Sequence, residues 1–133
     1  MALGILASIR NSIMTQISAA IDAGSVGGKI RFYDGTRPAT GGTVTTLGGT
    51  VTYQTTSYGT AAAGAITANT PLVDGTGVAA ITTTWARILD SDDVFVMDAD
   101  VATSGADINV NTTTMSIGVN IAVTASVLTA GNA

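Results

Sequence analysis

Aspartate is concentrated in one short segment of this sequence. The eleven residues from Asp90 to Asp100 contain five of the nine acidic residues of the chain. Carboxylates this close together could hold a divalent cation that takes oxygen ligands, or could work as an acid and base pair. They could also belong only to turns, because aspartate accepts hydrogen bonds from nearby backbone amides.

The first part of this segment, Asp90-Ser91-Asp92-Asp93, lies between two runs that alternate like β-strands. Polar residues of these types between two strands indicate a hairpin, and we predict one here. Asp98 and Asp100 alternate with apolar neighbours, which places both carboxylates on one face of a strand. We expect them to be solvent-facing or edge charges that block unwanted strand pairing.

A calcium site is the alternative for Asp98 and Asp100, with Asp107 or Asn109 as further ligands. The calcium-loop template requires a glycine at its sixth position and a closing glutamate. Counted from Asp98 the sixth residue is Thr103, and the chain has no glutamate. A glycosidase-like carboxylate pair would need an aromatic-lined cleft, and the chain has one Trp, three Tyr and two Phe. We therefore predict no metal, no cofactor and no catalytic pair.

The amino-acid composition excludes further classes of function. The 133 residues include no cysteine, histidine or glutamate, so most hydrolase and metalloenzyme chemistry lacks its usual groups. We predict that the protein is not an enzyme and has no small-molecule substrate. A net charge of -4 with five basic residues gives no basic stripe for nucleic acid. Charged residues make up 11% of the chain, against roughly 25% in an average domain, which favours a homo-oligomer that packs against neighbours.

The first 24 residues have the pattern of an amphipathic helix, and Gly24 supplies a stop at its C-terminal end. The apolar stripe consists of Leu6, Ile9, Ile13, Ile17 and Ile21. We predict that residues 1–24 form an N-terminal helical arm whose stripe packs either on the chain's own sheet or on another subunit. Membrane binding is a weaker alternative, because the polar face lacks the lysines and arginines that anionic lipid attracts.

From residue 28 onward the apolar period changes to two, which is the period of β-strands. Such runs cover residues 29–33, 44–53, 65–68, 78–89, 94–101 and 108–129. The second run splits at Gly48-Gly49, and the last predicts two strands broken near Gly118. Closely spaced turn signals between such runs are typical of antiparallel sandwiches and barrels. We predict a mainly β protein, with an antiparallel β-sandwich or barrel over residues 28–133 preceded by one N-terminal amphipathic helix. Trp85 is the expected core anchor.

Five segments together carry a family resemblance: IRFYDGTRPATGGT, GAITAN, TTWARILDSDD, VMDADVATSGADINVN and IAVTASVLTA. This succession, from Ile30 to the end, resembles a group of small structural proteins of tailed-bacteriophage virions. Its most distinctive features are the Thr36-Arg37-Pro38 loop, the tryptophan before a polar hairpin, and residues 103–107. The resemblance implies a structural part of the particle, most like a capsid decoration (cement) protein.

From the resemblance we expect a protein that binds the outer capsid lattice, with the major capsid protein or other virion proteins as partners. Its location would be the virion, assembled in the host cytoplasm. A tail, neck or fibre-base subunit is one alternative. A carbohydrate-binding β-sandwich, with Trp85 against the sugar, is another.

The predicted contact residues are the five residues of the apolar stripe and three residues near the first strand, Arg31, Tyr33 and Arg37. Arginine suits an interface with little other charge, because its planar guanidinium can form two parallel hydrogen bonds.

Overall fold

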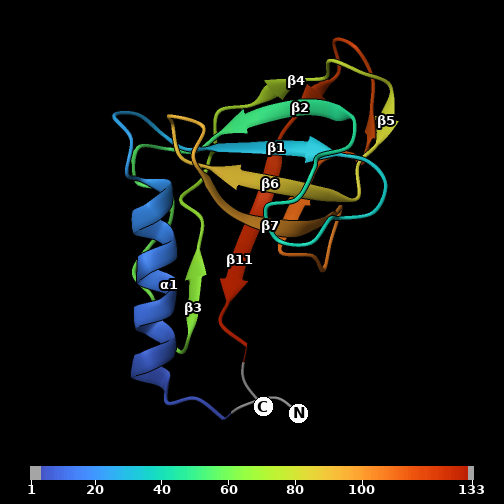
Figure 1. The fold of residues 1–133 in the computed structure, drawn as a ribbon. Coiled ribbons are helices and arrows are strands. Elements are labelled where there is room, and N and C mark those ends of the chain that lie inside the picture. The colour runs from blue at the N-terminus through green and yellow to red at the C-terminus, as the bar shows by residue number, and fades with distance from the viewer. Residues whose placement is uncertain (1–3, 132–133) are drawn as a thin grey trace.

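The computed structural model describes residues 4–131, and they form a mainly β chain with one helix at the N-terminal end (Figure 1). This confirms the predicted fold class. The helix and strands are α1 (Ala7–Ile21), β1 (Lys29–Tyr33), β2 (Leu47–Thr52), β3 (Ala65–Thr67), β4 (Gly75–Thr76), β5 (Ile81–Thr82), β6 (Trp85–Leu89), β7 (Phe95–Ala102), β8 (Ile108–Val110), β9 (Thr114–Met115), β10 (Asn120–Ile121) and β11 (Val123–Thr129).

Seven strands form one curled sheet, a half-barrel, in the order β2-β1-β6-β7-β8-β11-β3. Neighbours in this sheet are antiparallel except β7 and β8, which run parallel with Val101 opposite Ile108. Two further pairs, β10 with β4 and β5 with β9, form short two-stranded ribbons. The core includes fully buried side chains from the central strands, such as Ile30, Phe32 and Ile88. A single curled sheet therefore encloses the core of this protein.

Strand β6 is buried on both faces. Ala86 and Ile88 lie in the core, and on the opposite face Trp85 is only 1% exposed. Residues 34–46, between β1 and β2, cross this second face, where Trp85 Nε1 donates a hydrogen bond to the Asp34 carbonyl (2.9 Å). The burial of Trp85 confirms its predicted role as a core anchor.

Strand β2 runs through Gly48 and Gly49 without a break, whereas the sequence predicted two short strands around them. A Cβ at Gly48 would lie 2.5 Å from Ile81 Cδ1, and one at Gly49 would lie 2.3 Å from Ile121 Cδ1. Side chains of β5 and β10 thus pack directly on the β2 backbone, which requires glycine there. The C-terminal region likewise differs from its prediction, because it forms four strands, β8 to β11, and not two.

Helix α1 shares the core of the β-strands. It ends at Ile21, three residues before the predicted stop at Gly24. Met14 and Ile21 are buried in the main hydrophobic cluster, and α1 lies beside β3 (Figure 1). The helix is therefore integral to the fold, which favours the alternative that it packs on the chain's own sheet. Among the described residues, no helix has the length and apolar character needed to cross a bilayer.

Polar side chains help to set how α1 is rotated against the strands. Arg10 Nη2 donates to the Ala130 carbonyl (3.2 Å), and the Gly64 amide donates to Asn11 Oδ1 (2.7 Å). These bonds hold the face with Arg10 and Asn11 against the domain, next to the buried Met14. A helix fixed this way turns part of its apolar stripe outward.

Candidate functional site

Seven charged side chains lie together on the outer face of the sheet and its covering loop, and we call this set the charged face. It consists of Lys29, Arg31, Arg37, Arg87, Asp93, Asp98 and Asp100. Strand register explains the grouping, because Arg31 stands opposite Arg87 and Arg87 stands opposite Asp98. The set contains four of the five basic residues of the chain.

The centre of the charged face is a two-point ion pair between Arg87 and Asp98. Arg87 Nε and Nη2 lie 2.7 and 3.0 Å from the two carboxylate oxygens, and the two side chains are only 12% and 5% exposed. Arg87 Nη2 also donates to the Gly42 carbonyl (2.9 Å). The guanidinium carbon lies 5.5 Å from the Trp85 ring centre and 5.0 Å from that of Phe95. The hydrogen bond that Arg87 donates to Asp98 raises the pKa of Arg87 above its ordinary value. Because the same guanidinium also bonds Gly42, it holds residues 34–46 on the sheet.

Exposed ion pairs flank this centre. Lys29 Nζ and Arg31 Nη2 each lie 2.8 Å from Asp93 Oδ1, and Arg37 Nη1 lies 3.0 Å from Asp100 Oδ1. The hydrogen bond from Lys29, together with the charge of Arg31, lowers the pKa of Asp93 below its ordinary value. Exposed pairs of this kind contribute little stability individually. Their effect is to give every cation of the charged face an anionic partner.

The predicted hairpin at residues 90–93 is confirmed between β6 and β7. Asp90 Oδ1 accepts hydrogen bonds from the amides of Asp92 (2.8 Å) and Val94 (2.9 Å). Asp93 has a φ of +67°, a conformation that aspartate tolerates better than most residues. The aspartates of the turn therefore shape the backbone, and Asp93 also reaches the basic residues of β1.

Asp98 is not a solvent-facing or edge charge, so that prediction is wrong. Strand β7 has a neighbour on each side, and the Asp98 carboxylate is nearly buried against Arg87. Asp100 is in an exposed ion pair, and Asp107 Oδ2 accepts from the Asp100 amide (3.4 Å). The oxygens that the calcium alternative needed are thus bonded to protein donors. Within residues 4–131, no three acidic, His or Cys side chains are grouped to hold a metal ion.

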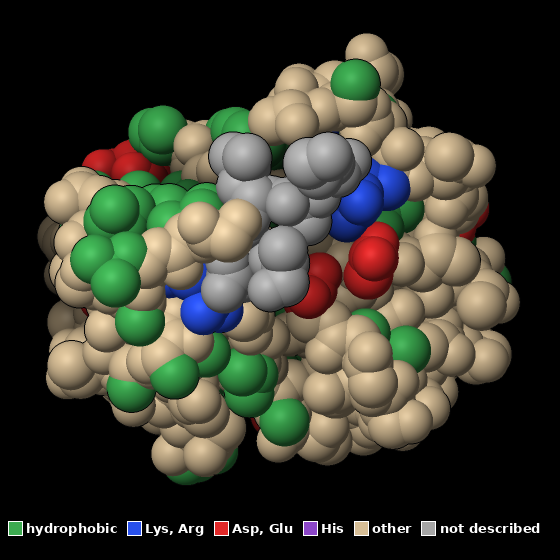
Figure 2. Space-filling model, turned by 90° about the horizontal axis from the view of Figure 1, so that it is seen from below, with side chains coloured by type: hydrophobic (Ala, Val, Ile, Leu, Met, Phe, Trp, Pro, Cys, Tyr) green, Lys and Arg blue, Asp and Glu red, His purple; other side chains and the backbone are tan. Residues whose placement is uncertain are grey.

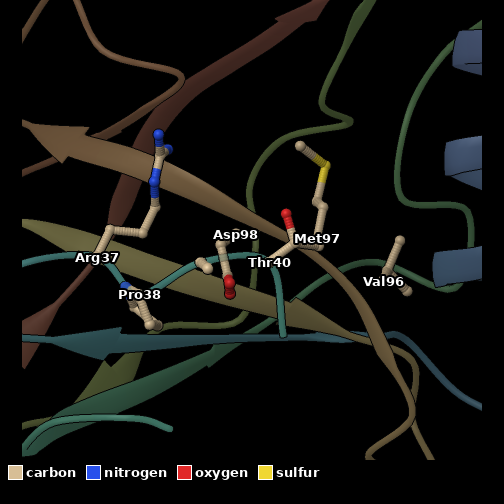
Figure 3. Close-up of a pocket in the computed structure, with 7 residues that line it drawn as sticks. Arg37, Pro38, Thr40, Val96, Met97 and Asp98 are labelled. Carbon is tan, nitrogen blue, oxygen red and sulfur yellow. The ribbon is translucent and has the colours of Figure 1, made fainter. Parts of the chain in front are cut away.

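A shallow pocket of about 400 Å³ lies where residues 37–40 pass over β7 (Figure 3). Its walls are formed by Arg37, Pro38, Ala39, Thr40, Val96, Met97 and Asp98. Both charged groups in this lining are already in ion pairs. Nucleophilic catalysis needs a hydroxyl or thiol next to a free base, and these seven lining residues do not provide that combination. The pocket therefore has no nucleophile and base placed next to each other in its lining.

The helix residues predicted as contacts divide into two groups. Leu6, Ile9 and Ile13 are 68%, 54% and 42% exposed, whereas Ile17 is partly buried and Ile21 fully buried. Figure 2 shows hydrophobic side chains gathered on the side of the molecule formed by α1. The predicted stripe is thus split between the core and the surface. We call the exposed part, Leu6, Ile9 and Ile13, the helix stripe from here on.

The three contact residues predicted near β1 are placed differently. Arg31 and Arg37 are partly exposed but belong to the ion pairs described above. Tyr33 is only 5% exposed, and its ring stacks on Trp85 with 4.7 Å between ring centres. Simple alternation placed Tyr33 at the surface. Because its ring is stacked on Trp85 and buried, Tyr33 is not available as a surface contact.

Sequence reasoning missed two features of the surface. The Arg87–Asp98 pair had only a partial signal in the sequence, since Arg87 lies three residues before Asp90 and Asp98 lies five after Asp93. The register shift between Ile88 and Leu89 brings the two residues opposite each other. Ile117 is 82% exposed, although it lies within the run at residues 108–129 that was predicted to form strands.

Comparison with known proteins gives no assignment: no family model, no curated protein and no solved structure matches this chain. The resemblance to tailed-bacteriophage virion proteins stays a prediction. The carbohydrate-binding alternative loses its expected sugar platform, because Trp85 is buried and its indole N–H is bonded to Asp34.

Proposed function

We propose that this chain is a non-enzymatic structural protein of a tailed-bacteriophage virion that binds the outer capsid lattice as a decoration (cement) protein. The observation that carries the proposal is the helix stripe. Leu6, Ile9 and Ile13 keep between 42% and 68% of their surface in solvent although they lie on a helix that is integral to the core. Apolar residues grouped in this way mark protein interaction sites.

The rest of the molecule supports a role in binding without chemistry. Each cation of the charged face has an aspartate partner within the chain, and the four cations and three aspartates leave the set with a net charge of +1. These residues therefore serve the fold and present no cluster of free charge. The outer edge of β2 is bonded to the following segment, with Thr52 and Val73 exchanging two hydrogen bonds (3.1 and 2.8 Å). The outer side of β3 is likewise bonded, by the Gly59 amide to the Thr67 carbonyl (2.9 Å). Assembly is therefore expected through side chains and not through strand addition.

The mechanism is stabilisation by mass action. Burying each stripe residue against a capsid subunit contributes roughly 1 kcal/mol, a part of the value for a fully buried side chain. A ligand that binds the assembled shell and not its separated subunits raises the stability of the shell. Many copies on one lattice add these contributions.

The test combines location with binding. Cryo-electron microscopy of the source virion should place this chain on the outside of the head, across capsomer junctions. Purified protein should bind heads that lack it, and the Ile9→Ser/Ile13→Ser double variant should bind at least about tenfold more weakly. Density only in the tail or neck would instead favour the tail, neck or fibre-base alternative, and absence from the particle would refute both.

The variant must leave the fold intact for this test. Removing residues 1–23, which a separable arm would allow, is unsuitable because it would also remove Met14 and Ile21 from the core. Val94→Ser is the matched control, since Val94 is 59% exposed on the β6–β7 turn. It should bind like the unmodified protein, and equal loss in both variants would contradict the assignment to α1.

A further inference from the structure

The two ribbons form one end of the molecule that carries no charged side chain. We call residues 75–84 and 111–121 the uncharged end; they contain β4, β5, β9 and β10 and no Asp, Lys or Arg. The nearest charge in the sequence, Asp74, accepts a hydrogen bond from Asn120 Nδ2 (3.2 Å) at the start of this region. Figure 1 shows β4 and β5 on the opposite side of the molecule from α1. The uncharged end is thus separate from the helix stripe.

Ile117 projects from this end in a turn that backbone bonds hold in place. It is 82% exposed, the highest value among the large exposed hydrophobic side chains. The Val119 amide donates to the Ser116 carbonyl (3.0 Å), and the Gly118 amide donates to the Gly77 carbonyl (3.0 Å). Gly118 has a φ of +85°, which glycine adopts readily. The isoleucine is therefore presented on a defined turn.

A shallow pocket of about 340 Å³ lies next to this turn. It is lined by Ala80, Ile81, Thr82, Thr114, Met115 and Ser116, so its last lining residue is the neighbour of Ile117 in the sequence. The exposed isoleucine is thus attached one residue beyond the wall of the pocket. Val78, also in the uncharged end, is 56% exposed.

We propose that the uncharged end is a self-association surface, at which Ile117 of one copy enters the pocket of a second copy and receives that copy's Ile117 in its own. A two-fold axis produces this reciprocal contact whenever a projection and its recess lie on one patch. The absence of charged residues from this end suits a second copy as the occupant. Two identical chains of charge -4 repel wherever their charged residues meet, and this end avoids such encounters, whereas a strongly charged partner would find no complementary group on it.

This inference deepens the proposed function, because it assigns the homo-oligomer contact of the decoration protein. Its location leaves α1 free for the capsid, so one copy could use both surfaces at once. The two proposals still fail separately: a monomer that decorates heads refutes the self-contact alone, and a dimer that does not bind heads refutes the capsid role alone.

Analytical ultracentrifugation of the purified chain over a concentration series tests the contact. The unmodified protein should show a monomer–dimer equilibrium. Ile117→Asp places like charges in the two pockets and should raise the dimer Kd at least about a hundredfold. Its circular dichroism should be unchanged, and so should its Tm at concentrations where both proteins are monomeric, since Ile117 is exposed. Val94→Asp, the matched control, should dimerise like the unmodified protein.

Disulfide cross-linking tests which residues meet at the contact. It is straightforward here because the chain has no cysteine of its own. An equal mixture of Ile117→Cys and Ala80→Cys chains should form a mixed disulfide dimer on oxidation, and a mixture of Ile117→Cys and Val94→Cys chains should not. A monomeric unmodified protein at every concentration, or an unchanged Kd in Ile117→Asp, would overturn the proposal. Equal cross-linking in the two mixtures would also overturn the proposal.

Discussion

The charged face and the uncharged end use their side chains in opposite ways. The charged face holds four of the five cations of the chain, each paired with an aspartate of the same set. The uncharged end has no ionic group and leaves Ile117 and Val78 in solvent. Ion pairs at the first region fasten residues 34–46 to the sheet, whereas nothing within residues 4–131 covers the projecting side chains of the second.

Under the proposal above, charge does not mark the contact surface of this protein. Charged groups that are already paired within a chain add little binding energy to a complex. Breaking an existing ion pair costs about as much free energy as forming a new pair with the partner provides. Exposed apolar groups are unsatisfied in the monomer and gain from burial. The comparison therefore predicts large folding effects only from substitutions at the nearly buried Arg87–Asp98 pair of the charged face, and association effects from surface substitutions at the uncharged end.

Asp98→Ala should have the largest effect on folding. It leaves the nearly buried Arg87 guanidinium without its partner, which we expect to lower the free energy of unfolding by about 3 kcal/mol. Because Arg87 lies over the ring of Trp85, and Trp85 is the sole tryptophan, fluorescence during urea unfolding reports the change directly. Asp100→Ala, on the same strand in an exposed pair, should cost less than about 1 kcal/mol. Equal losses in the two variants would show that burial does not distinguish the pairs.

Gly77→Ala should have an intermediate effect and should act on the uncharged end. A Cβ at Gly77 would lie 2.1 Å from the Ser116 carbonyl oxygen, and relieving this overlap is expected to cost about 2 kcal/mol. The displaced turn should also weaken dimerisation, while the near-ultraviolet circular dichroism of Trp85 should keep its native shape. Gly131→Ala is the control, because a Cβ there meets no atom within 4 Å. A native Tm in Gly77→Ala would mean that the ribbons do not pack as described.

Asp93→Asn should have the smallest effect and a defined pH dependence. The pKa of Asp93 is lowered in the folded chain, first by the hydrogen bond from Lys29, so its contribution is present above the ordinary value of 3.8 and is lost as pH falls below it. Asparagine tolerates the positive φ of this position and removes only the charge. The variant and the unmodified protein should therefore differ slightly in Tm at pH 7 and converge in acid. A difference that grows as the pH falls would contradict this sign.

Much of the fold could be predicted because its signals are local. The change of apolar period after residue 28 predicted the strands, the polar run at residues 90–93 predicted the hairpin, and the size of Trp85 predicted its burial. Glycine was the main source of error. Gly48 and Gly49 resemble a break in the sequence, but in the structure they admit side chains from β5 and β10, which lie more than thirty residues away in the chain.

The sequence by itself determined which residues share a face, since period and spacing follow from backbone geometry within one element. Tertiary structure alone decided what covers each face. It turned Leu6, Ile9 and Ile13 outward through the bonds of Arg10 and Asn11. It also buried Tyr33 against Trp85 and brought two distant segments together as the uncharged end. The physical reason is that burial and pairing depend on contacts between segments far apart in the chain, about which local periodicity carries no information.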